Sequence, residues 1–357
     1  MYKKQIATDK KVITFGEVML RLTAPDFLLF SQTNQMIATY GGSEANVAVS
    51  LANFGIPTEF VTRLPDNAVA RACIASLRAN GLGTEGIVFG GKRMGLYFLE
   101  SGAAFRNSNV VYDREGSSFA TLRPGMIDWE KIFSDAGWFH WSGIAAALSQ
   151  DGADACREAL EIADRMGLTI SCDLNFRKKL WNYGSSAAEV MQPLVQYSDV
   201  IFGAEPEYKE ILGIQPVGFK AVNAEDTTFE ANLPAFEDFG RRVVELVPRC
   251  QKAFLELRNS ITSNHNLLAA ILYSDNTLKH TGIYDIECEV DRVGAGDAFV
   301  GGMIYGLITY PDNDQKALEY ALAASALKNT VYGDFNHVMV EEVESLMQGN
   351  TSGRVSR

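Results

Sequence analysis

Short apolar runs alternate with longer amphipathic segments through most of the chain. The runs have the length and composition of buried β-strands, and they cover residues 12–15, 60–62, 138–141, 168–173, 200–202, 253–257 and 267–272. The intervening segments place apolar residues three or four positions apart, as an α-helix requires, over residues 68–79, 153–166, 236–247 and 317–328. Strands that alternate with helices form parallel sheets covered on both faces. The pattern therefore predicts an α/β fold with a mostly parallel central sheet.

Two regions break this alternation, because they contain strand-like runs without helices between them. The first region covers residues 20–40, and the second covers residues 95–122. Within the second region, residues 96–99 and 110–112 are apolar and aromatic. Consecutive strands inserted in an α/β chain indicate a separate sheet. We therefore expect a small β-sheet beside the central one.

Composition limits the classes of function. The 357 residues are 47% hydrophobic, which is enough for one large α/β domain with an insertion or for two domains. A formal net charge of -12 argues against nucleic acid or an anionic membrane as the main partner. The five cysteines are widely spaced and odd in number, which is typical of reduced thiols. Since no apolar run resembles a signal peptide or a membrane span, we expect a soluble, cytoplasmic protein.

The most informative stretch of the chain is residues 291–298, with the sequence DRVGAGDA. The apolar residues after it have helical spacing, so the backbone N–H groups of Gly294, Ala295, Gly296 and Asp297 are expected at a helix N-terminus. Such N–H groups bind anions. The Asp297 carboxylate is then placed to take a proton from a hydroxyl that attacks a bound phosphate, as phosphoryl transfer requires.

Glycine turns before helices are common, and most of them carry no chemistry. Here, however, Gly301 and Gly302 add further small residues at a cost in helix propensity. A second glycine-containing segment, residues 41–49 with the sequence GGSEANVAV, precedes another predicted helix. The two segments together resemble the signatures of the ribokinase-like (PfkB) sugar kinases, with Arg292 where these kinases usually have threonine. The resemblance extends from Val12 to Glu344 and is greatest to the 2-keto-3-deoxygluconate kinases.

This resemblance implies a three-layer α/β/α fold of the ribokinase type, in which the small sheet is a lid over the sugar. It assigns residues 1–16, 41–90 and 123–347 to the core that binds ATP and sugar. Residues 17–40 and 91–122 become the lid, which is often a dimer interface in the family, so we expect a homo-oligomer. Residues 348–357 are small and polar and are expected to form a disordered tail.

The resemblance also implies which residues bind the sugar. Tyr112 and Arg114 stand where the similar kinases contact an acid sugar. An arginine fork holds a carboxylate with two charge-assisted bonds, which a neutral hexose does not require. The other candidates on the sugar side are Gly41, Gly42, Asn46, Tyr97, Asn175, Arg177 and Asp334. The expected reaction is ATP-dependent phosphorylation of the terminal hydroxyl of an acidic keto sugar, with 2-keto-3-deoxy-D-gluconate as the first candidate.

For the nucleotide side, the resemblance implies ATP and Mg²⁺, with a monovalent cation such as K⁺ as a third candidate. Glu207 would act on Mg²⁺ through water, although Ala204 replaces the asparagine that usually begins this motif. After the strand at residues 253–257 we expect a polar loop, residues 258–266, in place of the usual glycine-containing loop over the nucleotide. The residues assigned to the nucleotide are Arg258, Ser260, Gly294, Gly296 and Asn329.

Alternatives to an acid-sugar kinase remain open on the sequence. A kinase for fructose, ribose or a nucleoside would keep the same two signatures. A non-catalytic protein that binds a sugar or a nucleotide would share the fold, but it would have no need of a base at Asp297. A Rossmann dehydrogenase would require Gly-x-Gly-x-x-Gly after the first strand, and residues 15–19, FGEVM, do not supply it.

Overall fold

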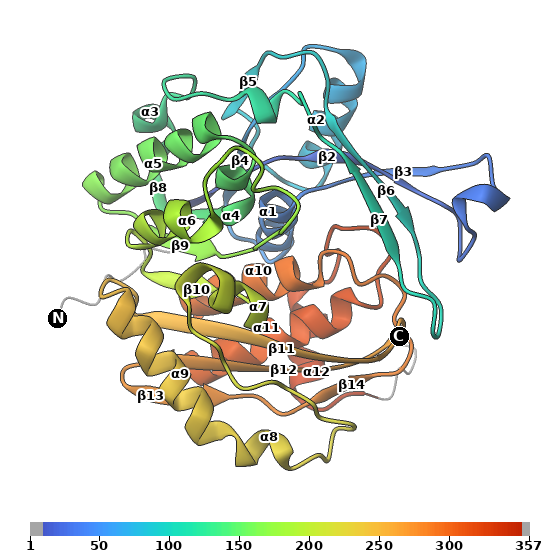
Figure 1. Ribbon diagram of the computed structural model, residues 1–357, viewed down its shortest axis with the longest axis vertical. Helices are drawn as coiled ribbons and strands as arrows, with labels where there is room; N and C mark the ends of the chain where they lie inside the picture. Colours follow the sequence, from blue (N-terminus) through green and yellow to red (C-terminus); the bar gives the residue numbers. More distant parts are fainter. Residues whose placement is uncertain (1–9, 352–357) are drawn as a thin grey trace.

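The computed structural model describes residues 10–351 and shows a large α/β body from which a small sheet projects (Figure 1). Residues 1–9 of the predicted core and residues 352–357 of the predicted tail lie outside the described range. The last described helix is α12, Val340–Met347. None of the helices within the described range is long and apolar enough to cross a membrane.

The central sheet has ten strands in the order β13-β12-β11-β10-β9-β8-β1-β4-β5, with β14 paired to a different part of β12. The strands from β11 to β5 are parallel, whereas β12 is antiparallel to β11, β13 and β14. The mostly parallel sheet predicted from the sequence is therefore confirmed. The strands are β1 Lys11–Phe15, β4 Thr58–Leu64, β5 Ile87–Phe89, β8 Ala136–Ser142, β9 Thr169–Asp173, β10 Val200–Phe202, β11 Lys252–Thr262, β12 His265–Ser274, β13 Thr277–His280 and β14 Tyr284–Ile286.

Helices cover both faces of this sheet, because its strands are apolar on both sides. In β12, for example, Leu267 and Ala269 belong to one hydrophobic cluster, while Leu268 and Ala270 belong to the other. The first cluster includes residues of α3 Trp129–Phe133, α4 Gly143–Ala147, α5 Gln150–Arg165, α6 Ala187–Val195, α8 Thr228–Ala231 and α9 Leu233–Leu246. The second includes residues of α1 Ser43–Asn53, α10 Ala295–Thr309, α11 Asp314–Lys328 and α12. Helix α2, Ala68–Ala79, packs with β4 and α1 in a third, smaller cluster.

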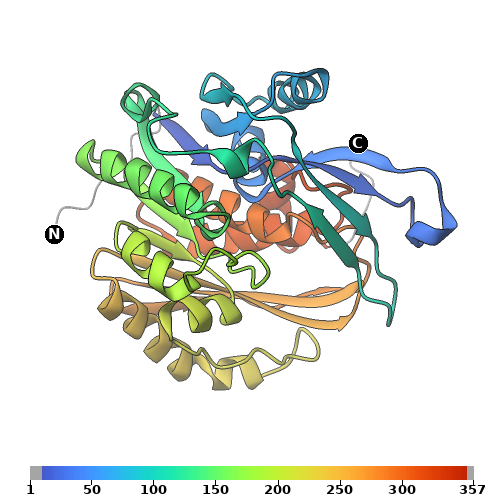
Figure 2. The same cartoon turned by 45° about the horizontal axis from the view of Figure 1, so that its top comes forward.

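The small sheet has four strands in the order β3-β2-β6-β7 and extends away from the body (Figure 2). Its strands are β2 Met19–Thr23, β3 Ile37–Gly41, β6 Gly95–Glu100 and β7 Asn109–Asp113. The two inner strands are parallel, and each outer strand pairs antiparallel with its neighbour. Both regions that break the helix–strand alternation thus contribute to one separate sheet, as the sequence predicted.

Helix α10 is packed tightly between α1 and α11. A Cβ added at Gly301 would lie 2.6 Å from the Ser50 side chain, and one at Gly306 would lie 2.7 Å from Ala317. Gly302 approaches Ala321 to 3.0 Å by the same measure. The glycines that lower the helix propensity therefore permit close contact with both neighbouring helices.

The prediction of a polar loop at residues 258–266 is wrong. Strand β11 continues to Thr262, and β12 begins at His265, so the segment is a β-hairpin with Ser263 and Asn264 at its turn. Ile261 and Thr262 are β-branched, and the apolar residues of β12 provide a long antiparallel partner. Pairing with β12 therefore outweighs the loop-forming tendency of the polar side chains.

Candidate active site

A cavity of about 1020 Å³ lies where the carboxyl ends of the central strands meet the small sheet and the N-terminus of α10. Parallel α/β sheets place their ligand sites at this edge. Segments far apart in the sequence meet here, since the wall includes parts of β2, α1, β6, β7, β11 and α10. The predicted residues on the wall are Gly42, Asn46, Tyr97, Tyr112, Arg114, Asn175, Arg177, Glu207, Arg258, Ser260, Gly294, Gly296, Asp297 and Asp334.

The turn before α10 has the geometry expected of an anion site. Gly294 caps the helix with φ +86°, a left-handed conformation that favours glycine. A Cβ at this position would also lie 2.1 Å from the Asp334 carbonyl oxygen. Asp297 lies in the first turn of the helix, where the backbone N–H groups are not used by the helix itself. The turn therefore brings N–H donors and a carboxylate to the same part of the cavity wall.

Two side chains of α1 hold the Asp297 carboxylate in place. Ser43 Oγ donates to Oδ1 and Asn46 Nδ2 donates to Oδ2, each at 2.7 Å. Burial raises the pKa of Asp297 to about 6, even though both hydrogen bonds favour the ionised form. At neutral pH the group is ionised and more basic than an ordinary aspartate, which suits it to accept a proton. Ser43 was not among the predicted site residues, although it lies inside the GGSEANVAV segment.

A group of charged and polar residues lies at the ends of β9 and β10, and it consists of Asp173, Asn175, Arg177 and Glu207. Asn175 Nδ2 donates to Ser43 Oγ at 3.0 Å and to Asp173 Oδ2 at 3.1 Å. Arg177 Nη1 is 3.4 Å from Glu207 Oε1. Burial first, and then the charge of Glu207, raise the pKa of Asp173 well above its ordinary value. Carboxylates that repel one another in this way favour a nearby cation.

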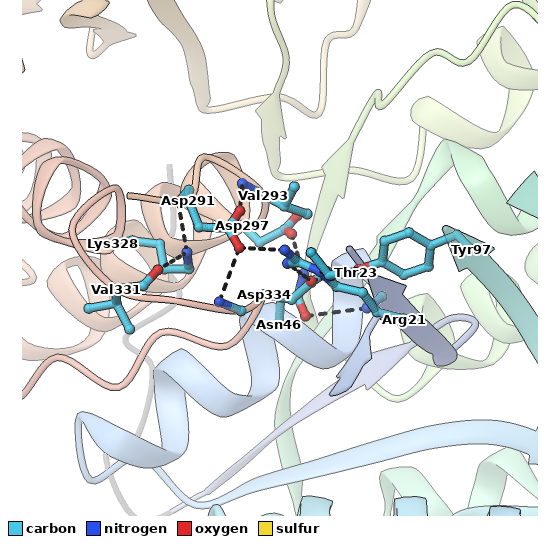
Figure 3. A network of polar contacts seen from close by, with 12 residues as sticks. Arg21, Thr23, Asn46, Tyr97, Asp291, Val293, Asp297, Lys328, Val331 and Asp334 are labelled. Carbon is cyan, nitrogen blue, oxygen red and sulfur yellow. Dashed lines mark hydrogen bonds and ion pairs between the residues drawn. The ribbon is translucent and has the colours of Figure 1, made fainter. Parts of the chain in front are cut away.

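The small sheet is joined to the α10 turn by a buried ion-pair network (Figure 3). Arg21 on β2 is 1% exposed, and its guanidinium donates to Asp334 Oδ1 at 2.6 Å and to Asp291 Oδ2 at 2.5 Å. The Tyr97 hydroxyl donates to the Asp334 carboxylate at 2.6 Å. Nothing in the local sequence around Arg21 pointed to this role, because both of its partners lie about 300 residues away in the chain.

Arg114 projects into the same cavity from the small-sheet side. Its guanidinium carbon lies 4.8 Å from the centre of the Tyr112 ring, a cation–π distance. Its Nε is 3.6 Å from Glu17 Oε2, which is an ion pair but too long for a hydrogen bond. Buried Nε and Nη1 therefore have no hydrogen-bond partner among the described residues. The unused donors leave room for an anionic group at this end of the cavity.

The model of the pfkB family carbohydrate kinases matches residues 9–237 and 268–338 of the chain. The chain belongs to this family. A 2-dehydro-3-deoxygalactonokinase of Haloferax volcanii is 30% identical over 96% of the chain and 98% of its own length. Among solved structures, a 2-dehydro-3-deoxygluconokinase from Thermotoga maritima is 40% identical, with a TM-score of 0.88, over 95% of this chain and 100% of that one.

A 2-keto-3-deoxygluconate kinase from Enterococcus faecalis, described as putative, is 26% identical with a TM-score of 0.84 over 98% of this chain and 99% of that one. The ribokinase-like fold and the sugar kinase activity expected from the two signatures are thus confirmed. A Rossmann dehydrogenase is ruled out by the same findings.

On the remaining wall of the kinase cavity, β11 contributes charged side chains. Arg258 Nη2 is 3.7 Å from Glu256 Oε1. Burial lowers the pKa of Arg292, and the nearby positive charge of Arg258 lowers it further. Ser260 Oγ donates to Asn266 Oδ1 at 2.5 Å, so its hydroxyl proton is already used within the hairpin. Glu256 and Arg292 were not predicted as site residues, although the arginine was noted as a departure from the signature.

Three predicted residues do not lie on the cavity wall. Asn329 is fully buried, and its backbone carbonyl accepts from the N–H groups of Val290 and Asp291. Ala295 is buried, and its N–H donates to the Arg292 carbonyl at 3.1 Å. Gly41 lies behind the wall, where a Cβ would be 2.1 Å from Asp334 Oδ2. Ala295 and Gly41 thus shape the backbone beside residues that do reach the cavity.

Proposed function

We propose that the protein transfers the γ-phosphoryl group of ATP to the terminal hydroxyl of an acidic keto sugar, most closely 2-keto-3-deoxy-D-gluconate. The observation that carries this proposal is Arg114, whose side chain is only 10% exposed and whose buried Nε and Nη1 have no hydrogen-bond partner among the described residues, in the same cavity as Asp297. A buried cation with free donors is costly unless an anion completes its hydrogen bonds. A sugar carboxylate supplies an anion with the two oxygens that a guanidinium fork accommodates.

The names of the relatives support the same class of substrate. The Haloferax protein is named for 2-dehydro-3-deoxygalactonate, and the Thermotoga protein for 2-dehydro-3-deoxygluconate. Both compounds are acidic keto sugars, and they differ from each other in the configuration of a hydroxyl group. The carboxylate is the feature that they share, which agrees with a recognition site built around Arg114.

In this proposal Asp297 is the general base. Ser43 and Asn46 hold its carboxylate in one orientation, and its raised pKa makes it a stronger proton acceptor at neutral pH. The N–H groups of Gly294, Gly296 and Asp297 would stabilise the negative charge on the transferred phosphoryl group. Ala295 was also assigned to this set, but its N–H would first have to leave the Arg292 carbonyl. Arg177, which lies on the cavity wall beside Glu207, would offset further phosphate charge.

ATP requires a divalent cation, and Mg²⁺ supplies charge neutralisation between the phosphates when it is bound. Within residues 10–351 no group of three or more His, Cys, Asp or Glu side chains could hold a metal ion. The acidic residues present instead fit an ion held mainly by phosphate and water, with Glu207 and Asp173 beside it. Arg258 on β11 and Arg292 in the turn before α10 would contact the nucleotide phosphates.

The test of this proposal is a coupled assay with ATP and a panel of four sugars: 2-keto-3-deoxygluconate, 2-keto-3-deoxygalactonate, fructose and ribose. We expect turnover of one or both acids and little turnover of the neutral sugars. Turnover of fructose or ribose alone would show that the arginine argument is wrong. The absence of turnover with every sugar, together with normal ATP binding, would favour a non-catalytic member of the fold.

Replacing Arg114 by lysine tests its role directly. Arg114→Lys keeps the positive charge beside Glu17 but loses the planar fork, so KM for the acid sugar should rise while kcat changes little. Losing part of a buried charge-assisted contact costs about 2 kcal/mol or more, which is at least about 30-fold in KM. Arg93→Lys is the matched control, because Arg93 forms an exposed pair with Asp113 of the same sheet. Equal effects of the two substitutions would contradict the proposal.

A further inference from the structure

Lys328, the last residue of α11, is a buried lysine in the wall behind the active-site turn. Its side chain is 0% exposed, and its ammonium Nζ donates to the backbone carbonyls of Asp291 and Val331, each at 3.1 Å (Figure 3). Lysine is almost never fully buried unless its charge is compensated. The position therefore calls for an explanation beyond ordinary packing.

The two carbonyls that bind the ammonium belong to the two segments that form the site. Asp291 is the first residue of the DRVGAGDA segment, which forms the turn before α10. Its carboxylate accepts hydrogen bonds from the backbone N–H groups of Val293 and Gly333, each at 3.1 Å. Val331 begins the loop that contains Asp334, whose carbonyl oxygen would lie 2.1 Å from a Cβ at Gly294. The Lys328 ammonium thus connects the turn before α10 with the loop that contains Asp334.

Charges of both signs surround the buried Lys328 ammonium. Burial lowers the pKa of Lys328 from its ordinary value, the carboxylates of Asp291, Asp334 and Asp297 oppose this shift, and Arg21 adds to it. The C-terminus of a helix also favours a positive charge, and Lys328 ends α11. Arg21 reaches Asp291 and Asp334 from the small sheet, so the ammonium is the second cation of the network.

Backbone carbonyls that converge from separate loops are also typical ligands of a monovalent metal ion, which the sequence resemblance raised as a third cofactor. In this protein the carbonyls of Asp291 and Val331 are already occupied by an ammonium of the same charge. A K⁺ ion at this point would have to displace the Lys328 ammonium, which is covalently attached to the chain. An ammonium that stayed nearby would repel the ion, because both are positively charged. The residues present therefore do not fit a bound monovalent ion between these carbonyls.

We propose that the Lys328 ammonium is a built-in replacement for a monovalent cation, and that it positions the Asp291–Asp297 turn for phosphoryl transfer. Lys328 is then a positioning residue, because it acts through the turn and does not touch the reacting atoms. The kinase readout rests on the proposed function, but the structural readout given below does not. The proposal means that the protein needs no added K⁺ for full activity or stability.

The experiment compares the native protein, Lys328→Ala and Lys328→Met in tetramethylammonium chloride, KCl and NH₄Cl at equal ionic strength. Each protein is assayed for kcat with the best sugar of the panel and for Tm without any substrate. Alanine leaves space in which a small cation can reach the two carbonyls. Methionine has a similar length to lysine and fills that space without a charge. Lys131→Ala, which removes an exposed lysine on α3, is the control for a general effect of lost charge.

We expect the native protein and Lys131→Ala to show no difference between the three salts. Lys328→Ala and Lys328→Met should both lose about 100-fold in kcat in tetramethylammonium, because a displacement of the turn by about 1 Å is enough for that loss. K⁺ or NH₄⁺ should restore much of the activity of Lys328→Ala and raise its Tm by mass action. Neither salt should rescue Lys328→Met.

Three results would overturn the proposal. One is activation of the native protein by K⁺, and another is full activity of Lys328→Ala in tetramethylammonium. The third is a folded, inactive Lys328→Ala that no small cation rescues in either readout, which would give Lys328 a purely structural role. If the alanine variant does not fold, the salt series on the native protein still tests the replacement of a monovalent cation, and kcat of Lys328→Met still tests the positioning of the turn. If no sugar is phosphorylated, the kinase proposal fails, while the Tm series still tests Lys328.

Discussion

At the scale of single residues, Asp297 depends on side chains from another part of the chain. Ser43 and Asn46 hold both of its carboxylate oxygens, and Asn175 reaches the same serine from the end of β9. The signature segments identified Asp297 and Asn46 because their residue types and spacing are distinctive. Ser43 and Arg21 could not be identified in this way, since their roles depend on partners that only the folded chain brings near.

The substitution Asp297→Asn should lower kcat by about two to four orders of magnitude, because an amide cannot accept the hydroxyl proton. ATP affinity and folding should change little, since asparagine has the same shape. Steady-state kinetics and a titration with ATP measure these quantities separately. A variant with nearly normal kcat would show that Asp297 is not the base. Asp312→Asn, at an exposed position before α11, is the control.

The raised pKa of Asp297 predicts the acid side of the activity profile. Burial moves this pKa from 3.8 to about 6. The base is protonated and inactive below that pH, so log(kcat/KM) should rise with unit slope up to about pH 6 and then level off. Glu44, which accepts from Ser142 and whose pKa burial raises to about 7, also ionises in this range. The ionisation step that is absent from the pH profile of the residual Asp297→Asn activity belongs to Asp297. A variant profile that keeps every step would show that Asp297 is not the ionising base.

At the scale of elements, the pattern of apolar positions predicted the strands and helices of the core to within a few residues, including the three-residue strand β10. The hairpin of β11 and β12 was missed at residues 258–266, since polar side chains at a strand end do not reveal that another strand pairs with them. Asn329 was placed at the nucleotide, but α11 directs it into the interior. In both cases tertiary packing decided what local composition left open.

Arg21 links β2 to the turn before α10, so removing its side chain should cause a large loss of stability. Arg21→Ala removes the guanidinium that pairs directly with the buried carboxylates of Asp291 and Asp334, so the free energy of unfolding should fall by about 3–5 kcal/mol. Urea denaturation measures this loss. Arg93→Ala is the matched control, because its pair with Asp113 is exposed and is expected to contribute less than about 1 kcal/mol. Similar losses for both variants would contradict a special role for Arg21.

At the scale of the whole molecule, the small sheet has apolar side chains on both faces. Tyr97, Leu99 and Tyr112 face the cavity, while Leu22, Phe98 and Val111 form one row on the opposite face. An antiparallel pair that faces water usually alternates apolar and polar positions. The break in helix–strand alternation predicted that this sheet exists, but not where it docks, because its position depends on Arg21 and on contacts with distant loops.

We propose that a second copy of the chain covers this outer face, as the family resemblance implies for the lid. Light scattering after gel filtration should then show a dimer or a larger oligomer. Val111→Asp, at a half-exposed position of the outer row, should shift the protein toward the monomer. Val222→Asp is the control, because Val222 is a more exposed apolar residue far from the small sheet in the sequence. A monomeric native protein would contradict this proposal.

The close packing of α10 between α1 and α11 has a consequence for how the molecule opens. Every residue from Ala298 to Ile308 is buried, and glycines let the neighbouring helices pack against the helix backbone. Amide protons of this helix should therefore exchange with deuterium only when the whole fold opens. Those of β7, which is a largely exposed edge strand, should exchange by local fraying. On warming, the protein should therefore stop binding the sugar at a lower temperature than that at which α10 unfolds.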